Sequence, residues 1–384
     1  MIYDNCADTR SLYIHWPFCP YRCHFCPFVT VVGTNHLMDD YYQALKTEIE
    51  VFAKNSEKKL SLETLYIGGG TPSTWPNKLL LDMSGTLGNI FDISALQEFS
   101  LEVNPGTVQE EQLKVWKECG INRLSIGVQS LNDEVLAGLN RHQKASDVYQ
   151  LLDWCSGVFE NVSIDLIIGL PGVSDSEWKA MLHTVGSWPV KHISMYFLSI
   201  HENTPLFTRL VKNELTLPAD DPVVDLYYWS IETLASYGFE QYEVSSFAKQ
   251  GYRSKHNQVY WDSKPYKGFG IGSCSFDGNM RFANEKNIVR YIDALKNDKS
   301  VIVESETLTL EQRKLEIVML GLRRMDGLKI AEVIEMMNGE EQKRFFEKAS
   351  FFEEKKLLKC DGVRLYLTTM ALPIENEIAV KLLE

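Results

Sequence analysis

The sequence predicts an α/β fold in which a parallel sheet, open or closed into a full or partial barrel, precedes a small C-terminal helical unit. Two observations lead to this prediction. Over the first three-quarters of the 384 residues, short apolar segments rich in β-branched residues alternate with amphipathic helical patterns. From about Thr309 the alternation stops and helical segments follow one another. Alternating βα units with short connections favour parallel strands.

Six predicted strands form the repeating part of the chain. They cover residues 11–15, 64–67, 99–103, 123–128, 162–168 and 193–198. Helical patterns lie between them, for example over residues 39–55 and from Pro76 onward. The loops at the carboxyl ends of such strands carry the functional residues.

Unusual residues follow five successive predicted strands. They are the cysteines after the first, Gly68 to Gly70 after the second, Asn104-Pro105 after the third, Gln129-Ser130 after the fourth and Gly169 to Gly172 after the fifth. One polar strand end would be unremarkable, but five indicate a single site built from many loops.

The C-terminal part is predicted to form a small winged-helix-like unit. Helical patterns over residues 309–323, 330–338 and 340–355 precede a hairpin over 357–367 with its turn at Asp361-Gly362. We therefore place domain boundaries at 1–300 and 301–384. Winged helices often bind DNA, yet residues 309–384 hold 13 Lys and Arg against 14 Asp and Glu. A lid or partner surface is the better prediction.

Composition excludes several classes. The net charge of −13 argues against nucleic acid, and 45% hydrophobic residues exclude a disordered chain. No signal peptide is visible and no apolar run reaches the roughly 18–20 residues of a membrane span. We expect a reducing, cytoplasmic location, where clustered cysteines bind metals or perform chemistry.

Three of the eight cysteines, Cys19, Cys23 and Cys26, form a C-x₃-C-x₂-C motif. Buried cysteines without a chemical role do not fit this stretch rich in proline and charge. Structural zinc needs four ligands, and His15 or His24 could supply the fourth. A [4Fe–4S] cluster takes one thiolate per iron, so three thiolates leave one iron open. An open iron can chelate the amino and carboxylate groups of S-adenosylmethionine (SAM).

This spacing resembles that of the radical SAM superfamily, in which an aromatic residue such as Phe25 precedes the last cysteine. Gly68-Gly69-Gly70-Thr71 after the second strand fits neither a dinucleotide fingerprint nor a P-loop. The resemblance implies that this stretch, with Gly69, Gly70 and Thr71, receives the amino end of the methionine, since glycines let the backbone approach a ligand.

Four further motifs resemble the oxygen-independent coproporphyrinogen III oxidase (HemN-like) superfamily. They are Glu102-Val103-Asn104-Pro105, Gly127-Val128-Gln129-Ser130, Asn140-Arg141 and the stretch from Asp165 to Gly172. The resemblance implies a partial (β/α)₆ TIM-like radical SAM barrel. It also implies that Glu102 and Arg141 hold the polar ends of SAM, that Gln129 and Asp165 bind the ribose, that Tyr13 lies near the sulfonium and that Ser199 contacts adenine. Taken singly, Arg141 could serve an ion pair, and Asp165 and Asn104 could serve caps or turns.

Within this superfamily the chain looks most like the haem chaperones called HemW. Phe28 stands where the oxidases usually carry a further cysteine. His256 lies in an H-N-x-x-Y-W motif that the resemblance links to haem, and imidazole is a common axial ligand; the alternative is a histidine beside an aromatic packing pair. Pro27 and Trp16 depart from the chaperone pattern.

Because of these two departures, an enzymatic function remains an alternative. The alternative is an oxidase or a class C methyltransferase that uses the 5′-deoxyadenosyl radical on a tetrapyrrole or another substrate. The expected partners are haem or another tetrapyrrole, a haem-acceptor protein and an electron donor such as flavodoxin or ferredoxin.

Overall fold

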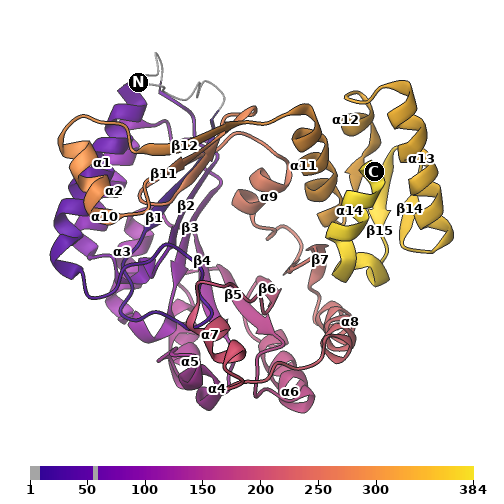
Figure 1. Cartoon of the computed structure of the whole chain (residues 1–384). Coiled ribbons are helices and arrows are strands. Elements are labelled where there is room, and N and C mark those ends of the chain that lie inside the picture. Colours follow the sequence, from indigo (N-terminus) through magenta and orange to yellow (C-terminus); the bar gives the residue numbers. More distant parts are fainter. Residues whose placement is uncertain (1–8, 55–58) are drawn as a thin grey trace.

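The computed structural model describes residues 9–54 and 59–384 (Figure 1). A nine-stranded sheet runs in the order β7-β8-β6-β5-β4-β3-β2-β1-β9. Its strands are β1 (Ser11–Trp16), β2 (Thr64–Gly69), β3 (Glu98–Val103), β4 (Arg123–Gln129), β5 (Asn161–Ile168), β6 (His192–Phe197), β7 (Glu240–Glu243), β8 (Ser246–Ala248) and β9 (Lys267–Phe269). Neighbours among β1 to β6 pair in parallel, and β9 pairs in parallel with β1. The predicted parallel barrel strands are thus confirmed.

Helices connect the parallel strands and cover the outer face of the sheet (Figure 1). They are α1 (Met38–Lys54), α2 (Asn77–Ile90), α3 (Glu110–Glu118), α4 (Asp133–Gly138), α5 (Ala145–Cys155) and α6 (Asp175–Gly186). In β4, Leu124, Ile126 and Val128 are fully buried in the main hydrophobic cluster. Because side chains alternate along a strand, Arg123 and Ser125 face the opposite way, into the barrel. The inner face is therefore polar.

The chain after β6 closes the open side of the barrel. It forms α7 (Pro205–Val211), α8 (Asp220–Ser236), β7, β8, α9 (Lys255–Trp261), β9, a three-stranded sheet of β10 (Cys274–Phe276), β11 (Met280–Asn284) and β12 (Ile302–Thr307), and α10 (Ile288–Lys296). The buried carboxylate of Glu98 on β3 accepts the backbone N–H groups of Lys255 and His256. This contact fixes the start of α9 against the barrel.

The C-terminal unit has its own hydrophobic cluster, which includes Val318, Leu328 and Phe345. It comprises α11 (Leu310–Arg323), β13 (Leu328–Lys329), α12 (Ile330–Ile334), α13 (Gly339–Glu354), β14 (Leu358–Cys360), β15 (Arg364–Leu367) and α14 (Glu375–Leu383). The predicted helices and hairpin are present. The boundary suggested at residue 300 falls just before β12, which pairs with β11.

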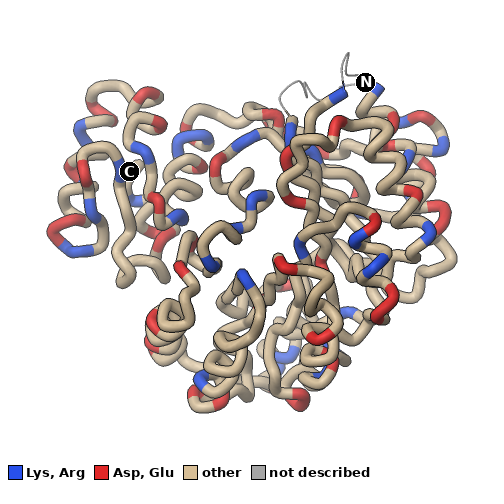
Figure 2. The backbone as a smooth tube through the Cα atoms, turned by 180° about the vertical axis from the view of Figure 1, so that it is seen from behind, with Lys and Arg blue, Asp and Glu red and all other residues tan. Residues whose placement is uncertain are grey.

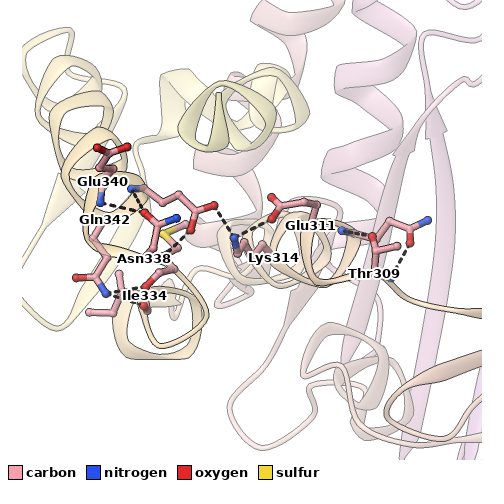
Figure 3. A network of polar contacts seen from close by, with 10 residues as sticks. Thr309, Glu311, Lys314, Ile334, Asn338, Glu340 and Gln342 are labelled. Carbon is pink, nitrogen blue, oxygen red and sulfur yellow. Dashed lines mark hydrogen bonds and ion pairs between the residues drawn. The ribbon is translucent and has the colours of Figure 1, made fainter.

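A buried lysine joins two helices of this unit. Lys314 on α11, with a side chain 3% exposed, binds both Glu311 and Glu341 at 2.9 Å (Figure 3). Asn338 caps the N-terminus of α13 by accepting from two backbone N–H groups. Basic and acidic residues are both spread over this unit (Figure 2). None of the helices in the described residues is long and apolar enough to cross a membrane.

Candidate functional site

A cavity of about 510 Å³ opens at the carboxyl ends of the parallel strands and extends into the barrel. Most of the residues singled out from the sequence line it. They are Cys19, Cys23, Phe25, Cys26, Gly69, Gly70, Thr71, Glu102, Gln129, Arg141, Asp165 and Ser199. Tyr13 and His256 do not. The fold thus brings residues from all six parallel strands and their loops into one site.

The cysteine loop follows β1 and is tied back to it. Cys19 donates its backbone N–H to Val31 O, and His15 Nε2 donates to Val29 O at 2.8 Å. Two polar groups approach the sulfurs: Thr71 Oγ1 lies 3.3 Å from Cys19 Sγ, and Arg141 Nη1 lies 3.7 Å from Cys23 Sγ. Burial raises the pKa of the Cys19 thiol to about 11, and the Thr71 hydroxyl and the positive charge of Arg141 oppose that rise. Iron binds the thiolate form, so these two groups favour the form that a cluster needs.

The single-metal alternative finds no support in the same geometry. Among the described residues, no three Cys, His, Asp or Glu side chains are grouped so that they could hold one metal ion. His15 uses both ring nitrogens, and Nδ1 of His24 lies 3.5 Å from Arg209. Cys19, Cys23 and Cys26 all line the cavity but are not grouped around one metal ion position. This arrangement suits a cluster, in which each thiolate binds a different iron.

The glycine run packs directly against the cysteine loop. Gly69 has φ +116°, and a Cβ there would lie 2.5 Å from the His15 ring. A Cβ on Gly70 would lie 2.5 Å from Pro17 O. Only glycine therefore lets the end of β2 approach the loop this closely. The Gly69 N–H donates to Glu102 Oε2 at 3.0 Å, so the run and the carboxylate form one unit.

Two buried carboxylates face the cavity. Burial raises the pKa of Glu102 to about 7, although hydrogen bonds from Tyr66 and Gly69 oppose the shift. Burial also raises the pKa of Asp165, against hydrogen bonds from Ser194 and Ser125 and the charge of Arg123. A cationic ligand would offset the cost of keeping both ionised.

Arg141 is held by a bend in β4. Its Nε donates to Gln143 Oε1 at 2.9 Å and its Nη2 donates to Gly127 O. A Cβ on Gly127 would lie 2.8 Å from Arg141 Nη2, so glycine makes room for the guanidinium. The register shifts between Gly127 and Gln129, and Gln129 has φ +65°. This irregularity lets the Gln129 side chain enter the cavity at the strand end.

A side pocket of about 350 Å³ adjoins the main cavity and contains Tyr13. Pro27 and Phe28 line both spaces. The side pocket is lined further by aromatic residues and by the exposed thiol of Cys274; its aromatic lining includes Tyr260 and Tyr266. Because His15 Nε2 must donate to the Val29 carbonyl, Nδ1 accepts from the Tyr13 hydroxyl at 3.0 Å.

Comparison with known proteins shows the family. Residues 13–185 match the model of the Radical SAM superfamily. The haem chaperone HemW of Bacillus subtilis (strain 168) is 32% identical over 372 residues, which cover 96% of this chain and 98% of that protein. The HemW protein of Lactococcus lactis is 31% identical over 375 residues, covering 97% of each. The chain belongs to the HemW family.

The fold has a close structural counterpart. Coproporphyrinogen III oxidase (HemN) from Escherichia coli, described as a radical SAM enzyme, superposes with a TM-score of 0.84 at 22% identity. The match covers 98% of this chain and 90% of that one. It establishes the shared radical SAM fold. Membership of the family implies a [4Fe–4S] cluster and SAM as cofactors.

His256, the haem ligand expected for a HemW protein, offers no free ring nitrogen in this structure. It lies on α9 with 1% of its surface exposed. Thr64 Oγ1 donates to Ser11, so His256 Nδ1 donates to Thr64 at 2.8 Å and Nε2 accepts from the Tyr260 hydroxyl at 2.9 Å. Haem iron could bind Nε2 only after Tyr260 moved away, so as it stands the motif packs α9 against the barrel.

The sequence did not predict three residues that the structure places in the site: Tyr66, Arg123 and Asn257. Tyr66 donates to Glu102 Oε1 at 2.9 Å and stacks on His256. Arg123 and Asn257 line the deep end of the main cavity. Alternation within β2 and β4 puts Tyr66 and Arg123 on the same strand face as Gly68 and Gly127, and this pattern could have indicated them.

Proposed function

We propose that the protein is a haem chaperone of HemW type, a radical SAM protein that binds haem and passes it to acceptor proteins. The observation that carries the proposal is the match to two HemW chaperones over nearly the full length of all three chains. Phe28, 62% exposed, occupies the place where oxidases usually carry a fourth cysteine, which supports the chaperone over the oxidase.

Cys19, Cys23 and Cys26 would hold the cluster, which, once reduced by an electron donor, would supply the electron for cleavage of SAM. Gly69, Gly70 and Thr71 would receive the amino end of the methionine. Glu102 and Arg141 would bind its charged groups, because a guanidinium suits a carboxylate and a carboxylate suits an ammonium. Gln129 and Asp165 would bind the ribose hydroxyls, and Ser199, at the cavity rim, would lie near adenine.

The side pocket is the place where we expect the macrocycle to pack. Its tyrosines and Phe28 offer flat apolar faces beside the cluster cavity. His256 does not line this pocket but is hydrogen-bonded to Tyr260, which does. His256 would bind the iron once Tyr260 moved away; otherwise a group that lines the pocket would bind it. The expected location is the cytoplasm, a reducing compartment that would keep the cluster thiolates available.

The C-terminal unit, residues 301–384, would face the haem acceptor or the electron donor.

Haem titration of the cluster-loaded protein tests the proposal. We expect a saturable Soret change, followed by transfer of haem to an apo-acceptor such as an apocytochrome. Absence of haem binding would reject the chaperone. His256→Ala should weaken binding if His256 is the ligand, whereas Tyr260→Phe, which frees Nε2, should leave binding equal or tighter. Equal binding by the wild type and His256→Ala would reject that ligand.

The enzyme alternative rests on one feature of the site. Pro27, which departs from the chaperone pattern, lines the main cavity. Trp16, the other departure, is buried and stacks on Trp75 at 4.2 Å, so it belongs to the core. Anaerobic reduction with SAM and a tetrapyrrole, followed by mass spectrometry, distinguishes the two. A modified product formed together with 5′-deoxyadenosine would favour an oxidase or methyltransferase.

A further inference from the structure

Arg123 is a buried guanidinium to which no described residue makes a hydrogen bond. It is the first residue of β4, it is 2% exposed, and it lines the deep end of the main cavity. Within residues 9–54 and 59–384 none of its N–H groups makes a hydrogen bond or an ion pair, and its Nε is fully buried. Buried charges in proteins are normally paired, so an unpartnered guanidinium that lines a cavity calls for an acceptor.

The nearest carboxylates do not supply it. The oxygens of Glu98 already accept from Ser100, Ser254 and the backbone N–H groups at the start of α9. Asp165 accepts from Ser125 at 3.2 Å and from Ser194. Both influence Arg123 through space without binding it. Because these two carboxylates lie near Arg123, a ligand group with two negative charges would be repelled more strongly than a group with one.

A second unused polar group lies in the same part of the cavity. Asn257, on the first turn of α9, lines the cavity, and its side-chain amide makes no hydrogen bond to any other described residue. A planar guanidinium that can donate two parallel hydrogen bonds, next to an amide N–H₂, is a donor set that fits a carboxylate. The cysteines of the motif follow the carboxyl end of β1, whereas Arg123 begins β4 at its amino end.

We propose that Arg123 and Asn257 form a carboxylate-binding subsite at the floor of the barrel. The ligand is a monoanionic carboxylate group that enters from the cavity. It belongs either to a larger molecule bound above or to a separate small acid. The proposal does not depend on haem transfer, so it can fail or hold independently of the chaperone function.

Acetate tests the subsite on the cluster-loaded protein. Sodium acetate should raise the Tm saturably, by about 2 °C at roughly ten times its Kd, whereas sodium chloride at equal ionic strength should not. Arg123→Gln should abolish the response. Because that variant could fold poorly, Asn257→Asp is the second test: it places a carboxylate beside Arg123, so it should raise the Tm without acetate and remove the acetate effect.

Gln258→Glu is the matched control. It adds the same charge to the same turn of α9 but lies outside the main cavity, so it should keep the acetate response. No saturable acetate effect, an equal effect of chloride, or an acetate effect that persists in both Arg123→Gln and Asn257→Asp would overturn the proposal.

Competition identifies the source of the carboxylate. If it belongs to SAM, acetate should compete with SAM but not with 5′-methylthioadenosine, which lacks the amino acid. If it is a haem propionate, haem should bind more tightly than its dimethyl ester, and Asn257→Asp should remove the difference. Acetate binding that competes with neither ligand assigns the subsite to a separate small acid.

Discussion

Glu102 Oε2 accepts the backbone N–H of Gly69 at 3.0 Å, while Oε1 accepts the Tyr66 hydroxyl at 2.9 Å. The carboxylate therefore links β2 and β3 at the wall of the cavity. It has no cationic side chain bound to it in the described structure, and its burial makes ionisation costly. This arrangement gives Glu102 a measurable effect on stability.

Glu102→Gln should change how stability depends on pH. The pKa of Glu102 is about 7 in the folded protein and ordinarily 4.5, so the unfolded chain loses this proton first. Stability should then fall as pH rises from 4.5 to 7, by about 3 kcal/mol from this group. Urea unfolding of the cluster-free protein across that range should show the fall in the wild type and a flatter profile in Glu102→Gln. Identical profiles would contradict the assignment.

His15→Gln should act on the acid side. Burial lowers the pKa of His15 to about 4 from 6.5. Its contribution is complete above pH 6.5 and is lost as pH falls toward 4, an effect of about 3 kcal/mol. Gln keeps a donor for Val29 O but does not titrate. The variant should lose less stability than the wild type between pH 7 and 4; an equal loss would show that His15 does not limit acid stability.

Gly69→Ala should destabilise the protein by at least about 2 kcal/mol, because the methyl group meets the His15 ring and φ is +116°. Gly85→Ala is the control: Gly85 lies inside α2 with nothing within 4 Å, so alanine there should stabilise by about 1 kcal/mol. Chemical unfolding measures both. If Gly69→Ala were neutral, the close contact between β2 and the cysteine loop would be disproved.

Replacing Cys19, Cys23 or Cys26 singly by Ala should reduce bound iron from about four atoms per chain to nearly none after anaerobic reconstitution. Cys360→Ala, at an exposed position on β14, should retain the full complement. Iron and sulfide analysis gives the answer. Full iron in all three variants would refute the ligand set, and zinc in place of iron in the wild type would refute the cluster itself.

Lys314→Met should lower the Tm clearly more than Lys329→Met. Lys314 is nearly buried and binds both Glu311 and Glu341, so its loss leaves two carboxylates facing each other between α11 and α13. Lys329 and Glu332 are both largely exposed, and such pairs contribute little. Differential scanning calorimetry compares the two; equal shifts would mean that Lys314 does not join the helices.

Local sequence determined much of this protein. The alternation of strand and helix patterns predicted six parallel strands, and the C-x₃-C-x₂-C spacing with Phe25 placed three thiols in one loop. The run Gly68 to Gly70 at the end of β2 is visible in the sequence, although the contacts that require glycine there, with His15 and Pro17, are long-range. The strands and the cysteine motif depend on residue spacing within short segments, so they can be predicted from the sequence.

Other features depended on residues far apart in the chain. Whether His256 has a free ring nitrogen depends on Tyr260 in the same motif and on Thr64, which lies 192 residues away and which the motif cannot indicate. Tyr13 and Cys274 meet in the side pocket because β9 pairs with β1, a long-range pairing. Arg123 looked like an ordinary strand residue until the packed barrel showed it buried without a partner among the described residues. Burial and pairing are properties of the packed fold, so only the tertiary structure decided them.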